Sequence, residues 1–215
     1  MTIPFLLSVA LAVSPARATL LAPASKAVEV RNTGSASLVV DVAAPAAPWL
    51  RVRPARIVLR GGARGVLTVR AGLGGRPGDH EVLLLLVARP DGAGRIALRM
   101  RVGVRLRVRM PGQLVRHVLV RGLRVRSGRP RRFLLTVANA GNVTEQLRRA
   151  TVTLVRGGRI VSRLHTRSAR ELFPGARIVI GLPYAGGARG WVTALVSLRL
   201  DGSSVPVQRR YRLRL

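Results

Sequence analysis

The sequence predicts an all-β protein built from two tandem sandwich domains. Apolar and polar residues alternate with a period of two along many short segments, which is the side-chain period of a β-strand. In the clearest case, residues 95–109, every even position is apolar and most odd positions are arginine. Glycine and proline separate the segments, and Pro111-Gly112 divides them into two sets. This alternation indicates half-buried antiparallel strands rather than the continuous apolar strands of an α/β core.

The first set contains seven expected strands within about 90 residues. They comprise residues 27–31, 37–42, 49–53, 57–60, 65–70, 80–89 and 95–109. Gly61-Gly62 and Asp91-Gly92 supply the positive φ angles that tight hairpins require. Gly103 is expected to bend the long last strand. Seven short strands with turn signals between them predict an immunoglobulin-like sandwich.

The second set repeats this organisation. Its expected strands are residues 115–125, 132–139, 151–156, 159–165, 177–182, 191–200 and 205–215. Gly157-Gly158 is the clearest two-residue hairpin signal. Residues 144–149 and 168–172 are the only segments with helical character, and each is about one turn long. The expected fold is therefore all-β, with two tandem immunoglobulin-like β-sandwich domains.

The chain is strongly basic. Lysine and arginine total 38 against 8 acidic residues, for a formal net charge of +30, and Lys26 is the only lysine. Such a balance predicts affinity for polyanions. The alternative is a compositional bias toward arginine, in which case the charge describes solubility and not a site. Hydrophobic residues make up 48% of the chain and cysteine is absent, so packing without disulfides must supply the stability.

Residues 1–18 resemble a secretory signal peptide. A short apolar core at 5–13 precedes an Ala16-Arg17-Ala18 cleavage pattern, and the apolar run is shorter than the roughly 20 residues that span a bilayer. The expected domains are then 19–110 and 113–215, with the boundary at 111–112. No later segment has transmembrane length, so no transmembrane anchor is expected. The predicted location is extracytoplasmic, either secreted or associated with the cell wall.

No enzyme constellation is present in the sequence. His80, His117 and His165 lie far apart, with no spacing typical of a metal site and no cofactor motif. Asp79 belongs to a turn signature and is expected to accept backbone hydrogen bonds there. The tryptophans are expected to pack in the cores. We therefore predict no enzymatic activity, no metal and no cofactor.

Several short motifs occur in a shared order. The first domain contains Val28-Glu29-Val30-Arg31-Asn32-Thr33-Gly34, Pro48-Trp49-Leu50, Pro77-Gly78-Asp79-His80 and Val102-Gly103-Val104-Arg105-Leu106-Arg107-Val108. The second contains Val137-Ala138-Asn139-Ala140-Gly141-Asn142-Val143 and Glu171-Leu172-Phe173-Pro174-Gly175. Over residues 25–185 this order resembles the WxL-interacting surface proteins of Gram-positive bacteria, in a short form without their transmembrane anchor. The resemblance implies a peptidoglycan-binding first domain followed by a second immunoglobulin-like domain.

The first functional hypothesis is therefore a non-enzymatic surface module that docks on an anionic cell-wall polymer, peptidoglycan or teichoic acid, or on a surface protein. Its expected polyanion contacts are Arg99, Arg101, Arg105 and Arg107. Arginine suits these targets because its planar fork binds carboxylates and phosphates bidentately. Specific nucleic-acid recognition is not expected, since the sequence offers no groove-entering helix and few base-stacking aromatics.

The second hypothesis is assembly of secreted subunits. Two sandwiches, the first closed by a long alternating strand, are similar to periplasmic pilus chaperones, which lend a strand edge to a subunit. The apolar side of that strand would then be used, with Leu98, Met100, Val102 and Val104. Complete burial of these residues in the protein's own core would exclude this function. The sequence leaves the oligomeric state and the identity of any partner open.

Overall fold

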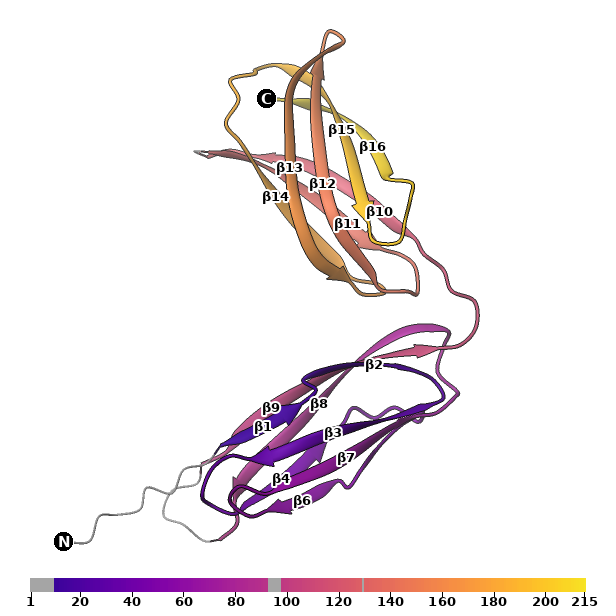
Figure 1. The fold of residues 1–215 in the computed structure, drawn as a ribbon. Helices are drawn as coiled ribbons and strands as arrows, with labels where there is room; N and C mark the ends of the chain where they lie inside the picture. The colour runs from indigo at the N-terminus through magenta and orange to yellow at the C-terminus, as the bar shows by residue number, and fades with distance from the viewer. Residues whose placement is uncertain (1–9, 93–97, 129) are drawn as a thin grey trace, which may run out of the picture. The chain divides into compact units, whose positions relative to one another are not determined.

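The computed structural model describes residues 10–92, 98–128 and 130–215. These residues contain sixteen β-strands and no helices. The chain divides into two compact units, residues 1–113 and 114–215 (Figure 1). Each unit is a sandwich of two sheets, so the predicted all-β fold of tandem immunoglobulin-like domains is confirmed. Nowhere in the described ranges is there a helix with the length and hydrophobicity needed to cross a bilayer.

The first unit packs a four-stranded sheet against a five-stranded sheet. The four-stranded sheet has the order β1 (Leu11–Ser14), β3 (Ala24–Asn32), β7 (Arg64–Ala71) and β5 (Leu50–Arg53). The five-stranded sheet has the order β2 (Arg17–Leu21), β9 (Met100–Met110), β8 (Gly78–Pro90), β4 (Leu38–Ala43) and β6 (Arg56–Leu59). Alternate residues of both sheets enter one core, among them Val28, Leu84 and Leu106, because side chains of a strand point to opposite faces in turn.

Strand β1 and the first two residues of β2 lie within the segment that the sequence suggested as a signal peptide. β1 pairs antiparallel with β3, and β2 pairs parallel with β9 from Arg17 opposite Arg105 to Leu21 opposite Arg109. Leu20 is buried in the core. Cleavage after Ala18 would remove β1 and the start of β2, so a processed chain that keeps this sandwich must begin before Leu11.

The second unit packs a three-stranded sheet against a four-stranded sheet. The three-stranded sheet has the order β10 (Val118–Arg126), β11 (Arg131–Asn139) and β14 (Arg177–Tyr184). The four-stranded sheet has the order β13 (Arg159–Leu172), β12 (Glu145–Arg156), β15 (Trp191–Leu200) and β16 (Val207–Arg214). In the core, the rings of Phe133 and Tyr184 meet edge to face, with their centroids 5.6 Å apart.

The two segments with helical character belong to long strands, so that interpretation was wrong. Residues 144–149 fall mostly in β12, and residues 168–172 form the end of β13. The two segments pair with each other, since Gln146 lies opposite Glu171. Pairing between residues distant in sequence overrides the weak local preference for a helical turn. Gly157 and Gly158, with φ angles of 51° and 76°, form the predicted hairpin between β12 and β13.

A buried asparagine forms the same corner in each unit. In the first unit, Asn32 Nδ2 donates to the carbonyl oxygens of Ala36 (2.6 Å) and Leu59 (3.0 Å), while its Oδ1 accepts from the Gly34 N–H (3.0 Å). In the second unit, Asn139 Nδ2 donates to two carbonyl oxygens and its Oδ1 accepts from the N–H two residues later. Each side chain thus satisfies backbone groups where the chain leaves a strand.

Gly141, in the second corner, is required for space and not for a left-handed backbone. A Cβ at this position would collide with the Val115 carbonyl oxygen and press on the His117 N–H. Its φ lies outside the positive range, in contrast to the hairpin glycines.

We predict that Asn139→Ala destabilises the protein by about 2–3 kcal/mol, because it leaves buried carbonyl groups without donors. Urea denaturation followed by circular dichroism measures the loss. The control is Gln208→Ala on the exposed side of β16, which should change stability by less than about 0.5 kcal/mol. Equal midpoints for the two variants would contradict the role of the corner.

Candidate functional site

The first unit has an open strand edge on β9. One edge of β9 pairs with β8 along its length, from Met100 opposite Ala88 to Met110 opposite Gly78. On the other edge, β2 pairs only with residues 105–109. Among the described residues no strand pairs with this edge over residues 100–104. We call this stretch the open edge.

Backbone hydrogen bonds show which groups point toward the open edge. The Arg105 N–H donates to the Ala16 carbonyl oxygen (3.0 Å), and the Arg109 carbonyl oxygen accepts from the Ala22 N–H (2.9 Å). Alternate residues of a strand direct their N–H and C=O groups to the same edge. Arg101 and Gly103 have the same parity as Arg105, so their N–H and C=O groups point into the unpaired region. They are the main-chain groups that an incoming strand would bind.

The apolar residues of β9 become more accessible toward its beginning. Val104 is completely buried in the core, Val102 and Met100 are half-buried, and Leu98, just before the strand, is 48% exposed. The four apolar positions singled out in the sequence are therefore not equivalent. Val104 is unavailable to a partner, whereas Leu98, Met100 and Val102 present apolar surface beside the open edge. The face is not fully buried, so the criterion that would exclude strand addition is not met.

The predicted arginine contacts lie on the other side of the strand. Arg101 and Arg105 are exposed and Arg107 is half-buried, while Arg99 precedes the strand. Gly103 interrupts the row at the position facing Leu85 of β8. Contact between these arginines and a polyanion stays a prediction. The beginning of the expected 95–109 strand, residues 95–97, lies outside the described residues.

A buried ion pair fixes the closed half of β9. Arg109 Nε and Nη2 donate to the two carboxylate oxygens of Asp79 on β8, at 2.6 and 3.0 Å. The Asp79 side chain is only 1% exposed. The sequence predicted backbone partners for Asp79 in a turn, and it did not indicate this guanidinium, which comes from the residue opposite Asp79 across the ladder. The pair joins β8 to β9 at the end opposite the open edge.

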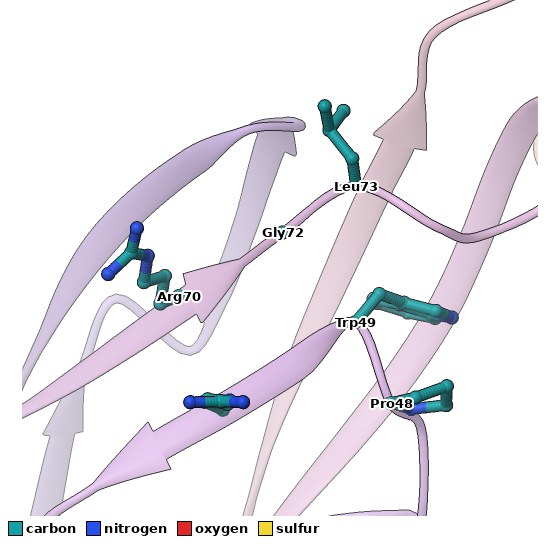
Figure 2. Close-up of a pocket in the computed structure, with 6 residues that line it drawn as sticks. Pro48, Trp49, Arg70, Gly72 and Leu73 are labelled. Atoms are coloured by element: carbon teal, nitrogen blue, oxygen red, sulfur yellow. The ribbon is translucent and has the colours of Figure 1, made fainter.

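A pocket of about 350 Å³ lies near the ends of β5 and β7. It is lined by Pro48, Trp49, Arg51, Arg70, Gly72 and Leu73. Figure 2 shows the Trp49 ring and the Arg70 side chain extending in opposite directions from their strands. The lining contains two cationic side chains and no carboxylate, which leaves it without a general base. These side chains do not converge on one reacting position.

The sequence also raised the histidines and tryptophans as candidate functional residues. His80 Nε2 lies 2.7 Å from the Arg76 carbonyl oxygen, and its ring is 5.2 Å from that of Trp49. Trp49 packs partly against the core, as predicted, whereas Trp191 is 57% exposed, contrary to the prediction. No group of three or more potential metal-binding side chains occurs in the described part of the chain.

Comparisons with known proteins identify the fold. The chain is similar to the class 5 fimbriae chaperone CfaA, with a TM-score of 0.56 and 12% identity over 95% of this chain and 98% of that one. It is similar to the YadV chaperone, with a TM-score of 0.53 and 13% identity over 94% and 99% of the two chains. The CsuC–CsuE chaperone–tip adhesion subunit complex of Acinetobacter baumannii matches with a TM-score of 0.53 and 11% identity, over 94% and 97%. No protein-family model matches, and no curated protein is significantly similar.

These matches correct the resemblance drawn from the sequence. The architecture is that of pilus chaperones, so the assignment to WxL-interacting surface proteins, and with it peptidoglycan binding at a cell wall, is wrong. The structure gives the physical reason: two of the matching motifs, at Asn32 and Asn139, are the hydrogen-bonded corners of the sandwiches. Motifs that a fold requires recur in unrelated proteins with that fold.

Sequence reasoning located β9 but not its open edge. The edge is defined by where β2 begins, with Arg17 opposite Arg105, and the first two residues of β2 were placed in a signal peptide. The alternation of Ala18 and Leu20 with Thr19 and Leu21 was the available indication of a strand there.

We predict that Arg109→Met lowers the free energy of unfolding by about 3 kcal/mol, because the buried Asp79 carboxylate loses its neutralising guanidinium. Urea denaturation of the full chain provides the measurement. Arg148→Met is the matched control, since Arg148 pairs with the exposed Asp201 at 2.7 Å and its loss should have far less effect. If the two variants unfold at the same urea concentration, the Asp79–Arg109 pair does not stabilise the pairing of β8 with β9.

Proposed function

We propose that the protein is a non-enzymatic, extracytoplasmic chaperone that holds a secreted subunit by adding the open edge of β9 to the subunit's sheet. The observation that carries this proposal is the unpaired edge at residues 100–104. An edge strand with free N–H and C=O groups is a template for another strand. Each main-chain hydrogen bond formed with a partner contributes about 1 kcal/mol, and pockets or contacts for alternate side chains add specificity.

The apolar surface beside the edge supports the same function. Met100 and Val102 are half-buried and Leu98 is exposed, so an incoming strand would cover apolar area as it forms its ladder. A subunit that lacks a strand of its own would expose the complementary apolar surface until it assembles. The chaperone would shield that surface with main-chain and side-chain contacts from one segment.

The structural neighbours agree with this function. Two of them are complexes: the CsuC–CsuE structure contains a chaperone and a tip adhesion subunit, and the Salmonella enterica SafB chaperone is in complex with SafA pilin. The shared fold places a long strand at the end of the first sandwich of this chain, where the open edge lies. A pilin-like subunit is therefore the partner that we propose.

We predict that Arg101→Pro prevents subunit binding while the protein remains folded. Proline removes the N–H that points to the open edge and leaves the ladder with β8 intact, and proline is tolerated on strand edges. The matched control is Arg101→Ala, which removes the same charge but keeps the N–H and should bind normally. Tagged variants are purified from the extracytoplasmic fraction of the source cells, the captured protein is identified by mass spectrometry, and binding is remeasured with the purified pair.

Hydrogen exchange of that complex checks where the partner binds. The amides of Arg101 and Gly103 should exchange at least about tenfold more slowly in the complex than in the free protein. Capture of the subunit by Arg101→Pro at the level of Arg101→Ala, or protection confined to other strands, would refute strand addition at this edge.

A further inference from the structure

The four-stranded sheet of the second unit carries a concentrated positive face that the proposed strand addition does not use. This arginine face consists of the outward side chains of β13, β12, β15 and β16, which are hydrogen-bonded neighbours in that order (Figure 1). Its inward side chains, such as Ala150, Val152 and Val196, form the core. The outward ones on β13 and β12 include the exposed Arg163, Arg167 and Arg149.

Three arginines lie in one row across this face. Arg149 of β12 is directly opposite Arg167 of β13 and directly opposite Arg199 of β15. Residues opposed in this way have Cβ atoms about 4.5–5.5 Å apart, and like charges at that distance destabilise a sheet. The neighbouring row is polar and uncharged on β12 and β15, with Thr151 and Ser197. An external anion would relieve the repulsion.

Strand β16 extends the positive face toward an exposed tryptophan. Arg210, Arg212 and Arg214 are all exposed, and they lie opposite Leu195, Thr193 and Trp191 of β15. The Arg212 guanidinium carbon lies 4.9 Å from the centre of the Trp191 ring. Trp191 is 57% exposed, so the face ends in an aromatic ring held beside cations.

Few carboxylates accompany the arginines of this unit. The unit contains 21 of the 38 basic residues but only three of the eight acidic ones. Glu145 is buried beside Arg116 at 3.3 Å, and Glu171 is at the end of β13. Asp201 accepts a hydrogen bond from Arg148, which lowers the pKa of the Asp201 carboxyl. The arginines of this unit therefore far outnumber its carboxylates, and Glu145 and Asp201 pair with arginines outside the row of Arg149, Arg167 and Arg199.

The geometry indicates which kind of polyanion fits. A sheet face presents its cations as an array over four strands and not as a cleft around one group, which matches a surface of repeated phosphates. Arginine binds phosphate oxygens bidentately, and tryptophan is enriched at the level of lipid headgroups. Single-stranded nucleic acid would need several aromatic rings for base stacking, whereas Trp191 and His165 carry the only rings directed outward from these strands among the described residues.

We propose that the arginine face docks the protein on the anionic phosphate headgroups of a phospholipid bilayer, with Trp191 entering the headgroup layer. This surface is distinct from the open edge, so an experiment can refute either proposal without affecting the other. Each arginine near an anionic bilayer adds to the attraction, which is screened by salt.

The test is sedimentation of the full chain with large vesicles. Vesicles of phosphatidylcholine alone are compared with vesicles containing about a third phosphatidylglycerol, over a series of salt concentrations. We expect binding only to the anionic vesicles, and binding should fall steeply with salt. The variant Arg149→Gln, Arg167→Gln, Arg199→Gln should bind at least about tenfold more weakly. In a Trp49→Phe background, Trp191 fluorescence should shift to shorter wavelength on binding.

The matched control removes the same charge from the opposite sheet of the same unit. Arg124, Arg126 and Arg132 are exposed on β10 and β11, and their triple replacement by glutamine should weaken binding less than about threefold. Equal losses in the two triple variants would mean that only diffuse charge acts, and would overturn the proposal. Three other results would also overturn it: equal binding to neutral vesicles, full competition by inorganic phosphate, or tighter binding to single-stranded DNA than to the anionic vesicles.

Discussion

The backbone ladder between β8 and β9 is the interaction on which the first unit depends. It pairs the two strands from Met100 opposite Ala88 to Met110 opposite Gly78. Because one edge of β9 pairs with β8, the alternation along the strand determines the direction of its side chains and of its remaining main-chain groups. Even residues turn into the sandwich, odd residues carry arginines outward, and the main-chain groups of the odd residues point to the far edge. The far edge is closed where β2 lies and open where β2 is absent.

The protein thus has two surfaces with different chemistry. In the proposed function, the open edge of the first unit binds through main-chain groups and the apolar residues beside them, and the Asp79–Arg109 pair lies at the closed end of the same ladder. In the second proposal, the arginine face of the second unit binds through side-chain charge, which is sensitive to salt in a way that a hydrogen-bonded ladder is not. A binding measurement at several salt concentrations can therefore separate the contributions of the two surfaces.

The comparison of Asn32 with Asn139 shows why short motifs misled the family assignment. Both asparagines satisfy backbone groups at a buried corner, and any sandwich that turns in this way has a use for the same residues. Their order along the chain correctly indicated two sandwiches. It carried no information on the ligand, because the contacts that hold these residues are internal to each unit. The two surfaces that we propose face a partner lie elsewhere, on an edge and on a sheet face.

Most strands could be predicted from the sequence, because the alternation of apolar and polar side chains is a local property with a period of two residues. It located β9 and assigned its arginines to one side. Local pattern could not show that β1 and β2 belong to the first sandwich, or that residues 144–149 and 168–172 pair with each other as strands. It also could not place Arg149 between Arg167 and Arg199. Only the tertiary structure decides which edge stays open and which charges become neighbours, because pairing joins residues far apart in the chain.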